Sequence, residues 1–160
     1  MDSRGLKAFR EAMAKHVGGV TIVTTRDESL SDWGVTATAV SFLSLEPPLV
    51  LVALLGAAGS TAAFGGAERF AVSILRPEHE DLAVRFATGR PDKFILGGFE
   101  ASPVSGLPVV RDALAVVECR RIDTLPGGDH EIVVGEVDDA RAGSGPALVH
   151  FDGDFTAVGT

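Results

Sequence analysis

The stretch that decides the fold covers residues 113–142, ALAVVECRRIDTLPGGDHEIVVGEVDDARA. Two long segments, 113–125 and 130–142, are rich in the β-branched residues that favour strands. The glycine pair between them is typical of a tight turn, so the sequence predicts a hairpin. Judged from these residues alone, Asp129 and His130 are either polar side chains at the tip of a turn or groups held out towards a ligand.

The remaining elements predict a mainly β protein. Residues 4–16 carry apolar side chains at helical spacing, and residues 76–89 begin with a proline and acidic residues and end at Gly89, as helices do. Further strands are expected at 20–26, 35–45, 49–55, 69–75 and 146–151, a short helix at 61–65, and an irregular stretch at 90–108. Because strands do not alternate regularly with helices, we expect an antiparallel barrel with a few helices, in a single domain over residues 1–160.

Composition excludes several classes of function. The net charge is −8 and no run of Lys or Arg occurs, which argues against a nucleic-acid partner. The one cysteine, Cys119, allows no internal disulfide and is expected in a core. The charged N-terminus does not resemble a signal peptide, and the longest apolar stretch, PPLVLVALLGAAG, is too short to cross a membrane. We therefore expect a cytoplasmic protein with no membrane partner.

Motifs for self-contained catalysis are missing from the sequence. There is no dinucleotide fingerprint of the G-x-G-x-x-G type, no P-loop and no G-x-S-x-G nucleophile elbow. The four histidines form no tight pair with one another or with Cys119, so no metal site is expected. Such a chain suits a protein that orients a cofactor and leaves the chemistry to it.

Three segments are candidates for holding a ligand. Residues 35–41, VTATAVS, combine small side chains with hydroxyls, although an ordinary strand has the same composition. Residues 54–64, LLGAAGSTAAF, lead through glycines to a helix start at Ser60, which suits a phosphate or simply a helix cap. Residues 85–94, RFATGRPDKF, carry a cluster of cations, which is either part of a site or a solvated turn.

Taken together, these segments resemble a known family. The chain contains, in order, FREAMAKHVGGVTIVTT, GVTATAVSFLSLEPPLVLV, RFAVSIL, RFATGRPDKF, GLPVVRDALAVVEC, GGDHEIVVGEV and LVHFDGDF. With these motifs it resembles the short flavin reductases, the reductase components of two-component flavin-dependent monooxygenases. The resemblance implies an FMN-binding split β-barrel, a homodimer, reduction of FMN or FAD by NADH or NADPH, and a partner monooxygenase that receives the reduced flavin.

The resemblance also implies a set of site residues. His130 would position the nicotinamide, without acting as an obligatory base. The nicotinamide dinucleotide would meet Asp129, His130 and Phe155. The flavin would meet Thr36, Ala37, Thr38, Ala39, Ser41, Ala53, Leu54, Leu55, Ser60, Thr61, Phe86, Ala87, Gly89, Arg90 and Lys93.

Two departures from the family pattern concern the flavin. Residues 53–63 contain no charged residue where relatives often have Asn, Lys or Arg, and position 38 is a threonine where relatives often carry an amide. Amide groups, Ser60, Thr61 and Arg90 would then hold the phosphate, which leaves the choice between FMN and FAD open. Two other functions are alternatives to a reductase. One is a non-catalytic flavin carrier or sensor on the same barrel, and the other is an enzyme like pyridoxamine-phosphate oxidase, which would need a stronger cationic cluster.

Overall fold

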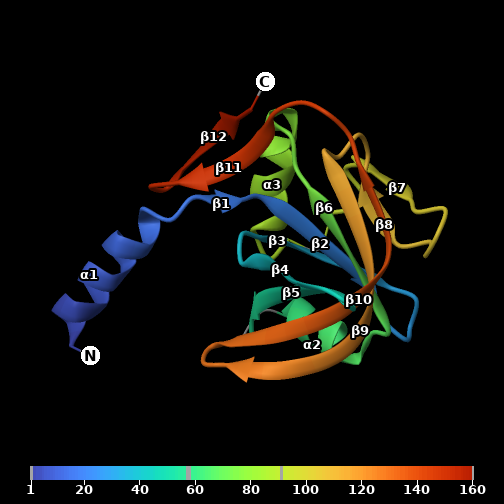
Figure 1. The fold of residues 1–160 in the computed structure, drawn as a ribbon, viewed down its shortest axis with the longest axis horizontal. Helices are drawn as coiled ribbons and strands as arrows, with labels where there is room; N and C mark the ends of the chain where they lie inside the picture. Colours follow the sequence, from blue (N-terminus) through green and yellow to red (C-terminus); the bar gives the residue numbers. More distant parts are fainter. Residues whose placement is uncertain (1, 57–58, 91, 160) are drawn as a thin grey trace.

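The computed structural model describes residues 2–56, 59–90 and 92–159. A single large antiparallel sheet dominates these residues and curls into a barrel (Figure 1). It contains β2 (Thr21–Arg26), β3 (Asp32–Ala37), β4 (Val40–Leu45), β5 (Pro48–Leu55), β6 (Arg69–Ile74), β9 (Ala115–Gly127) and β10 (His130–Ala142). The strand order is β3-β2-β6-β9-β10-β5-β4, and each neighbouring pair is antiparallel. The predicted mainly β, antiparallel architecture is confirmed.

The hairpin of β9 and β10 supplies the two longest strands of this sheet. His130 pairs with Gly127, so Gly128 and Asp129 form a two-residue turn. Gly128 has φ +76°, a conformation that glycine adopts without steric cost. The pairing shifts register near Gly135 and again near Asp139, and such bulges bend a strand and help a sheet to curl. The hairpin predicted from the sequence is present, with its turn where the glycine pair lies.

Two smaller sheets complete the β structure. β1 (Gly18–Gly19), β11 (Ala147–Phe151) and β12 (Asp154–Val158) form one of them, and β7 (Phe99–Ala101) pairs with β8 (Pro108–Val110) in the other. Leu148 N donates to Leu75 O (2.9 Å) and Leu75 N donates to Val20 O (3.0 Å). These bonds attach the C-terminal strands to the ends of β2 and β6.

The helices differ in how they are held. α1 (Ser3–Ala14) begins at Asp2, whose side chain accepts a hydrogen bond from Gly5 N (2.8 Å), and none of its residues is buried. It projects away from the barrel beside β1 (Figure 1). α2 (Gly59–Gly66), the 3₁₀ turn η1 (Pro77–His79) and α3 (Glu80–Phe86) lie against the sheet. A helix was predicted over 76–89. The structure has a helix there, but its first turn is 3₁₀ and it ends at Phe86, before Gly89.

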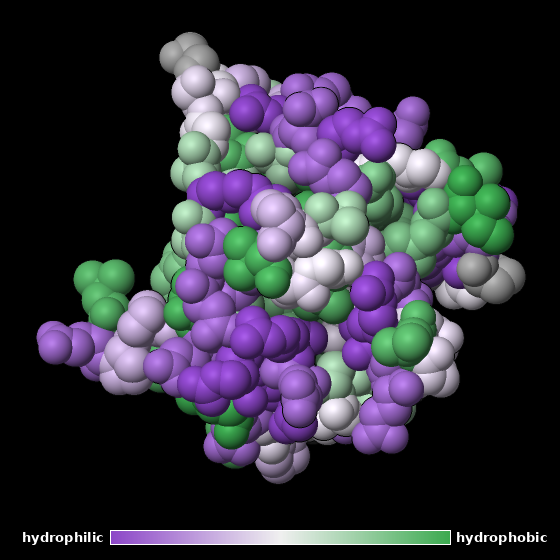
Figure 2. Space-filling view, turned by 90° about the vertical axis from the view of Figure 1, so that its right-hand side faces the viewer, coloured by the Kyte–Doolittle hydropathy of each residue, from purple (hydrophilic) through white to green (hydrophobic). Residues whose placement is uncertain are grey.

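The core lies on both faces of β2. Val23 faces a cluster inside the barrel that includes Phe64 of α2 and Phe70 of β6. The preceding residue, Ile22, faces a second cluster that includes Phe86 of α3. Because successive residues of a strand point to opposite faces, α2 and α3 are held on opposite sides of this part of the sheet. On the side of the molecule that carries β7 and β8, hydrophilic side chains cover most of the surface (Figure 2).

The predicted strand 35–45 proved to be two strands. β3 ends at Ala37, β4 begins at Val40, and residues 38–39 lie outside the strands. Ala53 N donates to Ala39 O (2.9 Å), which draws the connection towards β5. As a result β3 and β4 lie at opposite ends of the strand order, and β3 has a free edge. Four short strands were also missed. β1 lies where the first helix was expected to end, β7 and β8 lie in or next to the stretch expected to be irregular, and β12 follows the strand expected to be last.

Gly135 generates a prediction about stability. A Cβ added there would lie 2.6 Å from the Phe70 ring and from the Cys119 Cβ, which is closer than real contacts allow. We expect Gly135→Ala to lower the free energy of unfolding by about 1–3 kcal/mol, measured by urea denaturation, because the core must shift. Gly66→Ala is the control, since its Cβ would meet nothing within 4 Å. Equal stability of the two variants would contradict the packing described here.

Candidate functional site: a cavity along the free edge of β3

A cavity of about 740 Å³ lies beside the free edge of β3. This volume is in the range of small-molecule sites, and the edge offers backbone N–H and C=O groups that no strand pairs with. β5 and α2 contribute to the wall, as do α3 and the segment that follows it. The lining residues are Ser31, Asp32, Trp33, Gly34, Val35, Thr36, Ala37, Thr38, Ala39, Ala53, Leu54, Leu55, Ser60, Phe86, Ala87, Thr88, Gly89, Arg90, Lys93, Phe94 and His130.

The wall formed by α3 is fixed by two features of β3. The Thr36 hydroxyl donates to Ala83 O (2.6 Å), which attaches the helix to the strand. Gly34 leaves room for aromatic rings, because a Cβ there would lie 2.6 Å from Phe86 and 3.0 Å from Phe94. The Phe86 and Phe94 rings pack edge to face with their centroids 5.0 Å apart. The helix and the segment after it therefore present a well-defined surface to the cavity.

The two cations of the cavity differ in how they are paired. Lys93 Nζ donates to Gly34 O (3.3 Å) and Phe86 O (3.2 Å), and no carboxylate pairs with it among the described residues. Burial lowers the pKa of Lys93, since desolvation disfavours the ammonium form. Arg90 is exposed and forms a two-pronged pair with Asp92, at 2.9 and 2.8 Å. Lys93 is thus the cation whose charge is not already matched by an acid. Both Lys93 and Arg90 were expected to meet the flavin, and Arg90 was the one expected to hold the phosphate.

His130 lies at the opposite part of the lining, where β10 begins. It pairs through the backbone with Gly127 and with Leu55 of β5. Its Nδ1 lies 2.7 Å from Asp129 Oδ1, and its side chain is 40% exposed. The hydrogen bond to His130 lowers the pKa of Asp129, so this carboxylate stays ionised and orients the ring. No hydrogen bond to Nε2 is found within residues 2–56, 59–90 and 92–159, so this nitrogen can meet a ligand.

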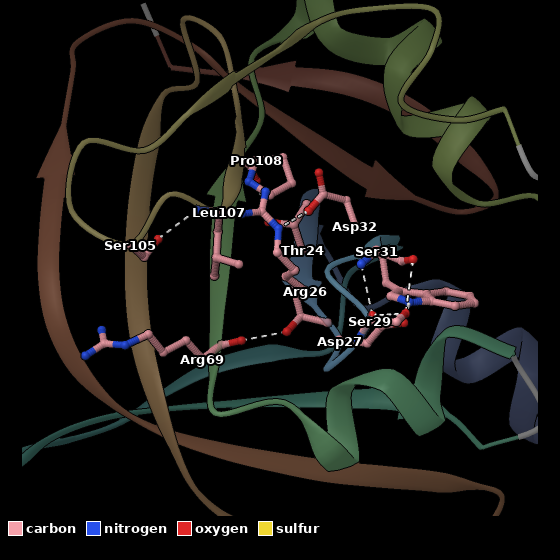
Figure 3. Close-up of polar contacts among 12 residues, drawn as sticks. Thr24, Arg26, Asp27, Ser29, Ser31, Asp32, Arg69, Ser105, Leu107 and Pro108 are labelled. Atoms are coloured by element: carbon pink, nitrogen blue, oxygen red, sulfur yellow. Dashed lines mark hydrogen bonds and ion pairs between the residues drawn. The ribbon is translucent and has the colours of Figure 1, made fainter.

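Trp33 is a lining residue that the sequence did not single out. Its Nε1 donates to Asp27 Oδ2 (2.7 Å), across the turn between β2 and β3. The other oxygen of Asp27 accepts from Ser29 N and Ser31 N, both at 2.9 Å, and from the Ser29 hydroxyl at 2.7 Å (Figure 3). Hydrogen bonds from Ser29 and Trp33 lower the Asp27 pKa to about 2. The sequence holds a cue to part of this arrangement, because an aspartate two residues before a serine is typical of a turn closed by the aspartate side chain. The bond of Asp27 to an indole six residues away has no comparable sequence signal.

The structure brings most of the expected site residues together in this cavity but leaves four outside its lining. Ser41 is exposed on β4, beyond the break at residues 38–39. Thr61 is 2% exposed, and its hydroxyl donates to Leu55 O (2.6 Å), so it fixes the start of α2. Asp129 reaches the cavity only through His130. The Phe155 ring packs edge-on against His150, with centroids 5.6 Å apart. Residues 57–58 of the predicted glycine-rich loop lie outside the described residues.

Other kinds of site were sought in the described residues. No group of three or more His, Cys, Asp or Glu side chains there could hold a metal ion. In the same residues, no helix is both long enough and apolar enough to pass through a bilayer.

Comparison with known proteins gives the class of this molecule. The family model of the flavin reductase like domain matches residues 13–159. The chain is 44% identical over 146 residues to the reductase component of 4-hydroxyphenylacetate 3-monooxygenase from Thermus thermophilus, covering 91% of each chain. It is 37% identical over 153 residues to NADH:riboflavin 5′-phosphate oxidoreductase from Streptomyces pristinaespiralis, covering 94% of this chain and 87% of the relative.

A solved structure agrees with this result. The NADH:FAD oxidoreductase SgcE6 of Streptomyces globisporus, in complex with NAD and FAD fragments, superposes with a TM-score of 0.91 at 29% identity. The match covers 99% of this chain and 96% of that one. The chain belongs to the flavin reductase family, which confirms the resemblance and the split-barrel fold class expected from the sequence.

Proposed function

We propose that this protein is an NAD(P)H:flavin oxidoreductase that reduces FMN or FAD and supplies the reduced flavin to a partner monooxygenase. The cavity along the free edge of β3 is the observation that carries the proposal. It combines small side chains, a cation and an imidazole, and it contains no cysteine and no serine–histidine pair. Two of the relatives are named for NADH-dependent flavin reduction and one as a monooxygenase reductase component, which supports the same function.

The residues of the cavity fit a flavin. Ala37 and Ala39 allow a flat ring to approach the backbone of β3, whose free edge can bond the polar edge of the ring. Lys93 Nζ lies 5.6 Å from the centroid of the Phe86 ring and donates to Gly34 O of β3. A phosphate bound beside this ammonium group would offset the cost of its desolvation. Ser60, at the start of α2, is a second phosphate donor.

The reaction needs orientation more than acid–base chemistry. A bound flavin accepts a hydride at N5 from C4 of the reduced nicotinamide, without help from a protein nucleophile. The chain contributes alignment, which is worth several kcal/mol in favourable cases, up to roughly 7–11. His130, held by Asp129, positions the nicotinamide dinucleotide at the end of the cavity formed by β5 and β10. A flavin carrier without turnover is not favoured, since such a protein would need no positioned imidazole.

The remaining parts of the proposal concern the setting of the enzyme. The family match over residues 13–159 supports a single flavin reductase domain. Cys119 is 1% exposed and burial raises its thiol pKa to about 12, so the thiol stays protonated and unreactive. A cytoplasmic location agrees with a free thiol and with the supply of NADH and NADPH there.

A turnover assay tests the function directly. We expect the purified protein to oxidise NADH or NADPH, followed by the loss of absorbance of the reduced nicotinamide, only when FMN or FAD is added. We further expect reduced flavin to accumulate under anaerobic conditions. Tight binding of flavin without any oxidation of either nucleotide would instead identify a carrier.

His130 generates a second prediction. In His130→Ala the nicotinamide loses its positioning group, so we expect kcat/KM for NADH to fall about tenfold, which corresponds to about 1.4 kcal/mol. Single-turnover measurements should show slower hydride transfer and a higher NADH requirement. His130→Gln, which keeps a hydrogen-bonding side chain, should recover part of the loss. Unchanged hydride transfer and NADH dependence in His130→Ala would make this residue part of the turn only.

We also propose a homodimer, because large apolar side chains on α1 and β4 are exposed. Phe9 and Met13 on α1 are 53% and 50% exposed, and Phe42 on β4 is 70% exposed. β4 is an end strand of the main sheet, and Phe42 borders a smaller hollow of about 120 Å³ lined by valines. A second copy would cover these surfaces, since a free apolar helix and strand edge favour association.

Light scattering tests the dimer. We expect a mass of twice 16.6 kDa for the unaltered chain. Phe9→Glu should shift the distribution towards monomer, because it places a charge in the buried contact. Lys7→Glu is the control, since Lys7 is exposed and its ion pair within the described part of the chain is with Glu11, on another face of the helix. A monomeric mass for the unaltered chain would disprove the dimer.

A further inference from the structure

We propose that Trp33 stacks on the adenine of FAD and thereby sets the preference of the site for FAD over FMN. This inference rests on the proposed function. Trp33 is the one tryptophan of the chain, it lines the cavity, and its side chain is partly buried. Phe86 and Phe94, which also line the cavity, pack against each other and against Phe99. No aromatic ring in the described residues packs on Trp33, so it can serve as a platform for a ligand ring.

The indole is held in place before a ligand arrives. Asp27 accepts its N–H at 2.7 Å, and the same carboxylate is fixed by two backbone N–H groups and a serine hydroxyl in the turn. Arg26 pairs with Asp32 at 2.7 Å and ties the two strands together beside this turn (Figure 3). A platform that is already oriented loses little conformational entropy on binding, so more of the stacking energy appears as affinity.

The position of Trp33 along β3 points to the adenine. Residues 36–39 line the cavity, and Lys93 Nζ lies 3.3 Å from the carbonyl oxygen of Gly34, the residue next to Trp33. A flavin whose ring lies on residues 36–39 and whose phosphate meets Lys93 would extend towards Trp33. FMN ends at this phosphate, whereas FAD continues with a second phosphate and an adenosine. Trp33 therefore touches a part of FAD that FMN lacks.

A nicotinamide dinucleotide is a less suitable occupant of this position. His130, which we propose to meet the nicotinamide, pairs with Leu55 on β5 and lies in a different part of the lining from the β2–β3 turn. The Trp33 indole could also serve only to close that turn through its bond to Asp27. That role needs the N–H group, while stacking needs the ring, so the two can be separated by substitution.

Kinetics with two flavins test the inference. For Trp33→Ala we expect the ratio of KM for FAD to KM for FMN to rise about tenfold, because base stacking on an aromatic side chain is lost. Trp33→Phe keeps a ring but loses the bond to Asp27, and it should keep the ratio within about threefold. Leu30→Ala is the matched control, since Leu30 lies in the same turn, is 79% exposed and does not line the cavity.

Two results would overturn the inference while leaving the reductase function intact. One is an unchanged FAD-to-FMN ratio in Trp33→Ala, with FMN still reduced. The other is an unchanged FAD-to-FMN ratio in Trp33→Ala together with a higher KM for NADH, measured with FMN as the acceptor. That result would show that the Trp33 ring contacts the nicotinamide dinucleotide. If the unaltered chain reduces neither FMN nor FAD, the proposed function itself is wrong.

Intrinsic fluorescence gives an independent readout that does not need turnover. The chain has one tryptophan and no tyrosine, so its emission reports on Trp33. We expect ADP, which carries the adenine but no flavin, to quench this emission saturably, and we expect ribose 5-phosphate to leave it unchanged. Absence of quenching by ADP at concentrations that inhibit FAD reduction would place the adenine elsewhere and contradict the stacking.

Discussion

The free edge of β3 is the constraint on which the rest of the site depends. A barrel that closed completely would pair this edge and leave no room for a ligand. The chain prevents closure at Thr38 and Ala39, where it leaves the sheet and bonds to β5. Thr36 then attaches α3 to β3, and Gly34 admits the aromatic rings that follow. The split in the barrel and the wall of the cavity are thus consequences of one strand end.

The fold was predictable where a signal was local. The hairpin of β9 and β10 follows from two β-branched segments around a glycine pair, and the structure confirms it. The break at residues 38–39 was not predictable, because the alternation of small and β-branched residues continues through it. Its cause is a hydrogen bond from Ala53, fourteen residues away. Short strands such as β12 were missed for the same reason, since they depend on pairing partners and not on their own composition.

The same distinction applies to the site. Thr36 and His130 stood out as hydroxyl and imidazole groups beside recognisable turns, and both line the cavity. The hydroxyls of Thr36 and Thr61 are both used inside the fold, since they donate to Ala83 O and Leu55 O. Only the coordinates reveal that Thr36 still lines the cavity whereas Thr61 does not. Trp33 was passed over because its importance lies in a bond to Asp27 and in the absence of an aromatic neighbour. Residue type suggests a role, and the contacts of the residue decide whether it is free to perform it.

The pairing of charges explains how an acidic chain can present an anion site. Of the two cations that line the cavity, Arg90 is matched by Asp92, an exposed pair that contributes little. Lys93 is half-buried, and its Nζ donates to two carbonyl oxygens. Burial still lowers its pKa, so these two hydrogen bonds offset only part of the cost of desolvating the ammonium group. A phosphate would complete that compensation locally, without a basic surface. Since Arg90 already has an acidic partner, Lys93 is the lining cation that a flavin phosphate would meet without displacing a carboxylate.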